Sequence, residues 1–214
     1  IFRLHWDGGW TLDTAFDGLY RTIEGQTYGW DAVIASGAAW FLDNGEGTEG
    51  FMAKGSFRTN GASAAPLHLV RADLRDGSVT LHEICGAPMG IVANPPVVDE
   101  SRSIAVGFDS ANATMTAFDV HADGTTSVRW RREQGHGPHM VLFPDTGELV
   151  THDHDLERMM EQLVVVDIET GAERGRVDTG SPLMAPVFPA PGFGRDLYSC
   201  AFPGVTRVWV EADA

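Results

Sequence analysis

The sequence has few cysteines, few basic residues and no long hydrophobic run, and each shortage excludes a class of protein. Two cysteines in 214 residues, Cys85 and Cys200, are too few and too far apart for a disulfide framework. The 15 basic residues face 30 acidic ones, and the net charge of −15 argues against nucleic acid or a membrane surface as partner. No apolar run reaches the roughly 20 residues that span a bilayer. We therefore expect a soluble, acidic, globular protein, of a compartment that the sequence does not specify.

What the sequence does have is a repeat, in which a strand-like run ends in a turn. The copies are Leu67–Gly77, Met115–Gly124, Leu163–Gly171 and, more weakly, 1–8 and 207–214. The anchor residues Asp73, Asp119, Asp167 and Glu211 follow one another at intervals of about 46 residues, which is the length of a four-stranded propeller blade. A β-sandwich also has short strands and turns, but it does not explain this period.

The rest of each repeat supplies further short apolar runs, separated by turn signals such as Pro144–Gly147 and Pro189–Gly192. Only Leu156–Leu163 suggests a helical turn. We predict an all-β fold, a β-propeller of four-stranded antiparallel blades within a single segment, 1–214. Three complete blades and two partial ones indicate part of a ring of six to eight blades. The complete blades are expected at about 28–86, 88–135 and 136–180, and the partial ones at 1–18 and 182–214.

Three features carry a family resemblance: the run Val164–Gly171, the turn Asp119–Gly124 followed by Trp130, and Gly180-Ser-Pro before the next blade. They resemble the repeats of the YVTN and PQQ-like propeller superfamily. The resemblance implies that the loops entering the first strand of a blade and joining its second and third strands gather on one rim of the central channel. The run Arg129–Arg132 flanks Trp130 on an outer strand, where a solvent-exposed edge is expected.

Histidines and aspartates concentrate on this expected rim in the third complete blade. His136 and His139 precede its first strand, and His152 to Asp155 end its second. In an extended strand His152 and His154 share one side. Imidazole and carboxylate are ligands of first-row transition metals, so His136, His139, His152, His154 and Asp155 form a candidate metal site. Alternatively His152 and His154 act as acid–base catalysts, or all are structural rim residues.

Further polar and aromatic residues are expected on the same rim and form a candidate ligand-binding set together with His136 and His139. They are Tyr28, Trp30, Asp31, Asp43, Asn94 and Asp109. An aromatic pair beside carboxylates suits a cationic or sugar-like ligand, although each residue also has a structural interpretation in packing or turn capping.

Two functions follow from these patterns. The first is a propeller that binds a small molecule at the loop rim of its channel, with or without a divalent metal ion and with or without catalysis. The alternative is a non-catalytic scaffold that binds a protein or a glycan. Fold alone does not choose between them, and whether the chain is an enzyme stays open at the level of sequence.

Overall fold

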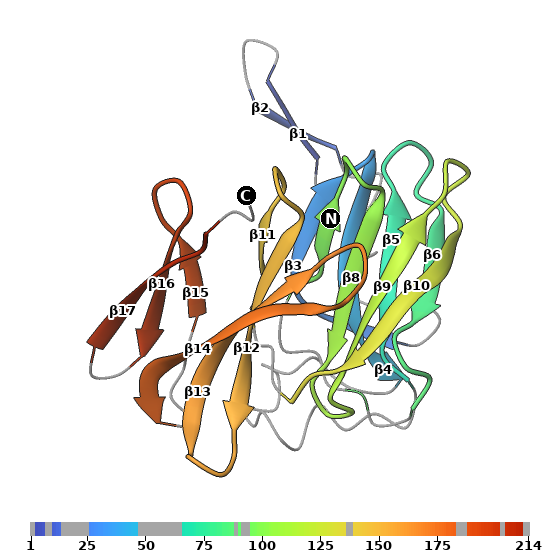
Figure 1. The fold of residues 1–214 in the computed structure, drawn as a ribbon. Helices are drawn as coiled ribbons and strands as arrows, with labels where there is room; N and C mark the ends of the chain where they lie inside the picture. The colour runs from blue at the N-terminus through green and yellow to red at the C-terminus, as the bar shows by residue number, and fades with distance from the viewer. Residues whose placement is uncertain are drawn as a thin grey trace.

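The computed structural model describes residues 3–6, 10–13, 26–46, 66–87, 90, 95–135, 139–182, 188–201 and 204–211. All regular elements in this part of the chain are β-strands, and they pair antiparallel (Figure 1). No helix among these residues is long and apolar enough to cross a membrane. The predicted all-β fold with four-stranded antiparallel blades is therefore confirmed.

Three sheets have four strands each, in chain order. The first blade contains β3 (Gln26–Ala35), β4 (Ala38–Glu46), β5 (His68–Asp73) and β6 (Val79–Glu83). The second blade contains β7 (Val97–Asp99), β8 (Ile104–Asp109), β9 (Thr114–Val120) and β10 (Thr126–Glu133). The third blade contains β11 (Val141–Phe143), β12 (Glu148–Asp155), β13 (Met160–Asp167) and β14 (Glu173–Pro182).

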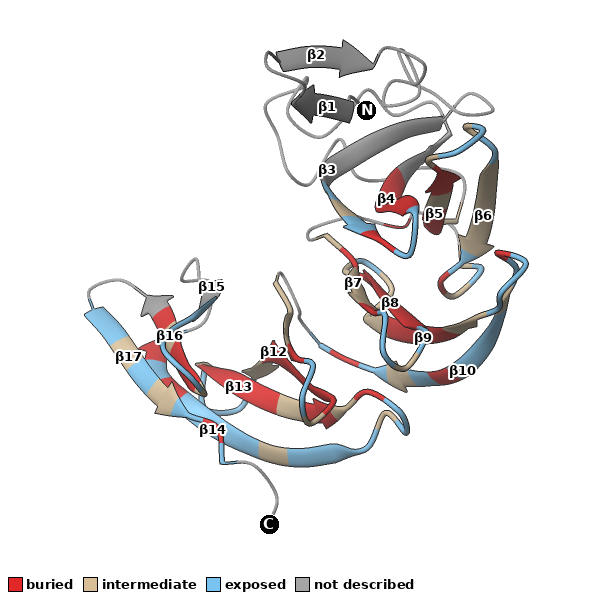
Figure 2. Cartoon of the chain, turned by 90° about the horizontal axis from the view of Figure 1, so that it is seen from above, coloured by how far each residue is buried: buried red, intermediate tan, exposed pale blue. Residues whose placement is uncertain are grey.

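Two smaller sheets accompany them. The fourth blade contains three strands, β15 (Phe188–Pro191), β16 (Asp196–Ala201) and β17 (Gly204–Trp209). A separate hairpin is formed by β1 (Arg3–Trp6) and β2 (Trp10–Asp13). Seen from above, the four blades follow one another around an arc (Figure 2).

The strand register confirms the repeat and corrects its last copy. Asp119 lies opposite Ile104 in the second blade, and Asp167 lies opposite Glu148 in the third. In the fourth blade the residue in this position is Trp209, opposite Asp196, and not Glu211. The neighbouring hydrogen bond agrees, because the N–H of the following residue, Val210, donates to a carbonyl as its equivalents do in the other blades. Because the last copy resembles the others only weakly, the sequence placed its anchor residue at Glu211, two positions beyond Trp209.

The expected helical turn at Leu156–Leu163 is also wrong. The segment Leu156–Met159 is a tight turn, and β13 begins at Met160. Met159 has a φ of 54°, which takes the backbone out of the helical region. The local sequence spacing did not show that the next residues pair with β12.

Three hydrophobic clusters of the described residues lie in the seams between blades, and a fourth, around Phe41 and Val70, lies within the first blade. One cluster joins Trp40 and Leu69 of the first blade to Phe118 of the second. The next joins the second blade to Leu149 and Val164 of the third, and another joins the third to the fourth. Alternate side chains of a strand point to opposite faces, so each inner strand contributes to two seams. This explains why β8 is buried along its whole length.

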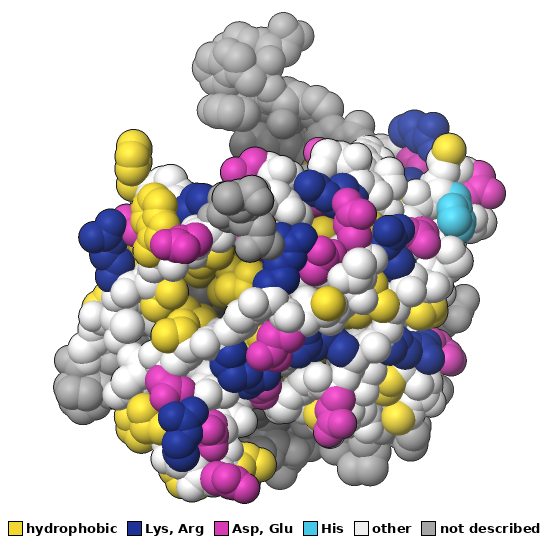
Figure 3. Space-filling view, in the orientation of Figure 1, with side chains coloured by type: hydrophobic (Ala, Val, Ile, Leu, Met, Phe, Trp, Pro, Cys, Tyr) yellow, Lys and Arg dark blue, Asp and Glu magenta, His cyan; other side chains and the backbone are white. Residues whose placement is uncertain are grey.

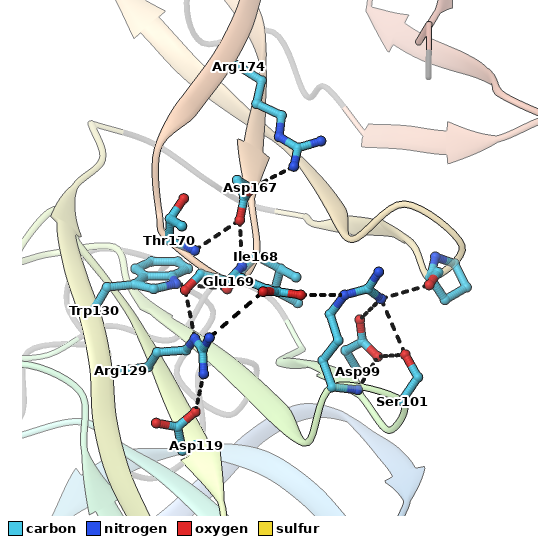
Figure 4. Close-up of polar contacts among 12 residues, drawn as sticks. Asp99, Ser101, Asp119, Arg129, Trp130, Asp167, Ile168, Glu169, Thr170 and Arg174 are labelled. Carbon is cyan, nitrogen blue, oxygen red and sulfur yellow. Dashed lines mark hydrogen bonds and ion pairs between the residues drawn. The ribbon is translucent and has the colours of Figure 1, made fainter. Parts of the chain in front are cut away.

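The seam between the second and third blades is closed by Trp130 of β10 (Figure 4). Its indole Nε1–H donates to the Ile168 carbonyl at 2.8 Å. The ring also lies against Gly171, where an added Cβ would come within 2.7 Å of it. Gly171 has a φ of 73°, so its position requires glycine for both conformation and space.

Arginine side chains reinforce this seam, although Arg129 and Arg131 are exposed, as expected for an outer strand. Arg129 donates to the Glu169 carbonyl at 2.6 Å and pairs with Asp119. Arg132 donates to the Gly171 carbonyl. The turn that receives them is held by Asp167, which accepts the backbone N–H groups of Glu169 and Thr170 (Figure 4).

Substitution of Trp130 by alanine should therefore cost about 3–5 kcal/mol of unfolding free energy, the usual loss for a buried aromatic side chain. Urea denaturation measures it. Val128→Ala is the matched control, because Val128 lies on the same strand but is 49% exposed. Equal losses for the two variants would contradict the role given to the indole.

A second seam predicts a dependence of stability on pH. His82 lies between the first two blades, with its Nδ1 2.8 Å from the Thr126 hydroxyl. Burial, and then the positive charge of Arg71, lower the pKa of His82 to about 4. Between a pH of about 6.5 and a pH of about 4, His82 is therefore protonated in the unfolded chain but neutral in the folded chain.

Stability should consequently fall as the pH drops from about 6.5 to about 4. Denaturation midpoints across this range measure the effect, and His82→Gln should reduce the slope. His121→Gln, at an exposed histidine, should leave it unchanged. The same slope in the His82 variant and the parent protein would refute this assignment.

Candidate functional site

The rim is the face at which the second strand of each blade ends and the third begins, at the lower side of Figure 1. On it, His152 and His154 end β12, and they lie opposite Leu163 and Glu161 of β13. His152 and Glu161 are buried, and the side chain of His154 is 16% exposed. His154 Nε2 lies 3.2 Å from Glu161 Oε1. One of the predicted residues, His154, therefore meets a buried carboxylate.

These side chains point toward the fourth blade. Val150 and Leu163 belong to the same face of the sheet as His152, and both pack with Leu197 of β16. Ser199 follows Leu197 by two residues on β16, so the two side chains lie on the same face of the strand. Ser199 is fully buried. Its hydroxyl has no hydrogen-bond partner among the residues that the structure describes. We call His152, His154, Glu161 and Ser199 the rim cluster.

Hydrogen bonds hold the rim cluster across both of its seams. Thr206 of β17 donates its hydroxyl to the Thr179 carbonyl, and Thr179 donates its own to the Glu161 carbonyl at 3.0 Å. On the other side, the side-chain amide of Gln134 donates to the His152 carbonyl at 2.5 Å. The backbone under the cluster is thus tied to the second and fourth blades together.

The two aspartates of this segment serve other contacts. Asp153 faces the second blade and pairs with Arg176 at 2.8 Å. Asp155 accepts hydrogen bonds from the backbone and the guanidinium of Arg158. These bonds lower the pKa of Asp155, and Arg158 also pairs with Asp178. Asp155 is therefore engaged in holding the turn between β12 and β13.

No three His, Cys, Asp or Glu side chains come together in a way that could hold a metal ion within the described part of the chain. His136 lies outside the described residues, and His139 is half-buried just before β11. The five-residue metal set thus stays a prediction.

A second polar pair lies at the rim end of the first blade. Asp43, which ends the buried part of β4, is fully buried. It accepts the backbone N–H of His68 at 2.8 Å and lies 2.8 Å from the Nδ1 of the same residue. His68 was not among the predicted residues, because it is 25 residues away from Asp43 in the sequence and no local pattern links them.

Asp109 occupies the corresponding position in the second blade. The registers of the first three blades make Asp43, Asp109 and Asp153 equivalent. Asp109 accepts the backbone N–H groups of Ala111 and Asn112 and the side-chain amide of Asn112. It therefore caps the turn between β8 and β9. Cys85, a free and half-buried thiol, lies beside it, and burial raises its pKa.

The remaining predicted residues are placed only in part. Tyr28, Trp30 and Asp31 lie on β3, but their side chains are outside what the structure describes. Asn94 is also outside the described residues. The sequence missed His68, Glu161 and Ser199. His68 and Glu161 have their partners on other strands, and Ser199 belongs to another blade, so only the strand register and the packing of the blades could have indicated these residues.

Comparison with known proteins shows that the fold of this chain is similar to the folds of several solved structures. No family model and no curated protein matches the chain. A luciferin-regenerating enzyme is 14% identical with a TM-score of 0.56, over 94% of this chain and 62% of that one. A chain of a nidogen/laminin complex is 14% identical with a TM-score of 0.48, over 85% of this chain and 59% of that one. The β-propeller domain of the Trilobed protease from Pyrococcus furiosus is 7% identical with a TM-score of 0.45, over 88% and 58%.

The chain thus spans about three fifths of the length of these structures. At such low identities the likeness concerns the fold alone.

Proposed function

We propose that this β-propeller binds a small polar molecule at the rim cluster and that His154, supported by Glu161, transfers a proton there. The observation that carries the proposal is the contact between His154 and the buried carboxylate of Glu161 at the rim end of the seam between the third and fourth blades. Polar groups held in a rigid scaffold at a loop face are typical of ligand sites.

The change of polarity along one seam supports a functional role. On the same face of β12, Val150 packs against apolar neighbours, whereas His152 and His154 follow it toward the rim. We infer that this polar end of the seam faces a polar ligand.

The His154–Glu161 contact defines the chemistry available. The carboxylate beside Nε2 orients the imidazole ring. In the proposed reaction Nδ1 is the atom that accepts or returns a proton. Ser199 offers a hydroxyl to a polar ligand group. The class of ligand is therefore small, neutral or anionic, with hydroxyl or carbonyl groups.

We also propose that the chain belongs to the YVTN and PQQ-like superfamily, as part of a ring of six to eight blades. The aspartates that cap the corresponding turns of the first and third blades, Asp73 and Asp167, and the docking of Trp130 on Gly171 support this proposal. The predicted blade limits and the metal ion at His136, His139, His152, His154 and Asp155 stand as proposals beside it.

The test uses saturation-transfer NMR with a set of small hydroxy acids and sugars on the whole chain. Fragments that bind should lose at least tenfold in affinity to His154→Gln and Glu161→Gln. His121→Gln is the matched control, because it exchanges an exposed histidine on the opposite face. If all fragments bind the three variants equally well, the rim cluster is not the site.

A thermal-shift series with Zn²⁺, Mn²⁺ and Ca²⁺, each followed by EDTA, tests the metal separately. A metal site predicts a rise in melting temperature that EDTA reverses and that His152→Ala abolishes. An unchanged melting temperature with all three ions would exclude the metal form of the proposal.

A further inference from the structure

The seam between the first and second blades is closed differently from the next seam. In the second blade Trp130 lies opposite Ala117, and the registers make Thr80 opposite Arg71 the equivalent pair of the first blade. The large side chain thus stands on the third strand in the first blade and on the fourth strand in the second. The Trp130 indole packs on the turn of the third blade, whereas the Arg71 guanidinium lies against Gly124, where an added Cβ would come within 2.9 Å of Nη1.

A pocket of about 230 Å³ lies beside this guanidinium, at the strand ends opposite to the rim. Val98 and Val120 form apolar parts of its wall. Ser36 and Ser103 add hydroxyl groups from the turns between the first and second strands of the two blades. Arg71 is the single arginine of the lining, and no lysine, aspartate or glutamate among the described residues lines the pocket. The pocket therefore combines one cationic group, hydroxyl groups and an apolar wall.

The Arg71 guanidinium has donors that its contacts with the protein leave available. A guanidinium carries five N–H groups, and among the described residues only Nη2 meets an acceptor, the Asp73 carboxylate at 3.2 Å. The same carboxylate accepts hydrogen bonds from the backbone and the side chain of Arg75. Two guanidinium groups thus share one carboxylate, and positive charge remains at Arg71, whose side chain is 12% exposed.

The other titratable groups around the pocket have partners of their own. The Glu100 carboxylate accepts the backbone N–H and the hydroxyl of Ser36. At the edge of the pocket, His121 Nε2 lies 3.1 Å from the Ser127 hydroxyl. Figure 3 shows basic and acidic side chains alternating over the visible face, so the net charge of −15 is not spread evenly over the surface. The charge inside the pocket is therefore that of Arg71.

We propose that this pocket binds a small organic acid whose carboxylate is held by Arg71 and the Ser103 hydroxyl. A short apolar stem of the ligand lies against Val98 and Val120. A guanidinium holds a carboxylate through two N–H groups at once. The Ser103 carbonyl accepts the Val120 N–H at 2.8 Å, which fixes the serine beside the apolar wall. This site lies at the other end of the strands from the rim cluster and does not depend on the function proposed there.

Titration of the whole chain with butyrate, followed by NMR of the backbone amides, tests the proposal. Butyrate should shift the amide signals of Ser103 and Val120. Butanol lacks the carboxylate, butylammonium has the opposite charge, and inorganic phosphate lacks the stem, so each should bind more weakly than butyrate. Binding of butanol or butylammonium as tight as that of butyrate would overturn the role of Arg71. Equally tight binding of phosphate would overturn the organic acid as the ligand class.

Variants locate the acid. Arg71→Gln should weaken butyrate binding roughly tenfold, the usual effect of losing a charged hydrogen bond. Arg131→Gln is the matched control, because it removes an exposed arginine of the second blade and should leave the affinity unchanged. Ser103→Gly suits the φ of 56° at this position, so it should fold and weaken binding roughly threefold.

The same titration separates this pocket from the rim cluster. His154→Gln should bind butyrate as the parent protein does. A loss in His154→Gln as large as in Arg71→Gln would place the acid at the rim cluster and overturn the proposal. Unchanged binding in Ser103→Gly together with equal affinities of the Arg71 and Arg131 variants would also overturn it.

Discussion

Packing of the fourth strand of one blade on the turn of the next is the contact on which the rest of this structure depends. A single blade has two apolar faces and cannot bury them alone. In the seam between the second and third blades, Trp130 covers the turn around Gly171, and Asp167 holds that turn in the shape that receives the indole. The direction of the contact also fixes the order of the blades around the arc.

The candidate site is a local change in the same kind of seam. Toward the turn face, the seam between the third and fourth blades is apolar around Leu163 and Leu197. Toward the rim, the same strands bring His152, Glu161 and Ser199 into it. The blades thus form a rigid scaffold, and the polar residues at the rim end of the seam add groups that can bind or react without a change in that scaffold.

The pocket beside Arg71 results from a further replacement at a seam. Thr80 stands where the next blade has Trp130, and the guanidinium of Arg71 lies against the following turn in place of an indole. Local conflicts with a regular pattern are where function is expected in a repetitive fold.

The fold could be predicted from the sequence because each repeat contains a strand-like run that ends in a recognisable turn, such as the turn after Asp119 and the one after Asp167. Those signals depend on residues near in sequence. In the last copy the sequence placed the anchor residue two positions too late, because Trp209 occupies the position that an aspartate has in the other blades. Only the hydrogen-bonded register resolves such a shift.

The site could be predicted only in part, for the same physical reason. His152 and His154 stand out as a cluster in the chain, and the structure places both in the seam. Glu161 and His68 do not stand out, since a single Glu or His has no local signature. Their roles arise from cross-strand partners, Glu161 with His154 and His68 with Asp43.

Native-state hydrogen exchange in increasing denaturant tests the central claim that interblade docking joins the second and third blades into one cooperative unit. The amides of Ile104–Asp109 and Glu148–Asp155, the second strands of these blades, should open with the same free energy and the same dependence on denaturant. Separate opening of the two strands, each with its own denaturant dependence, would contradict the account.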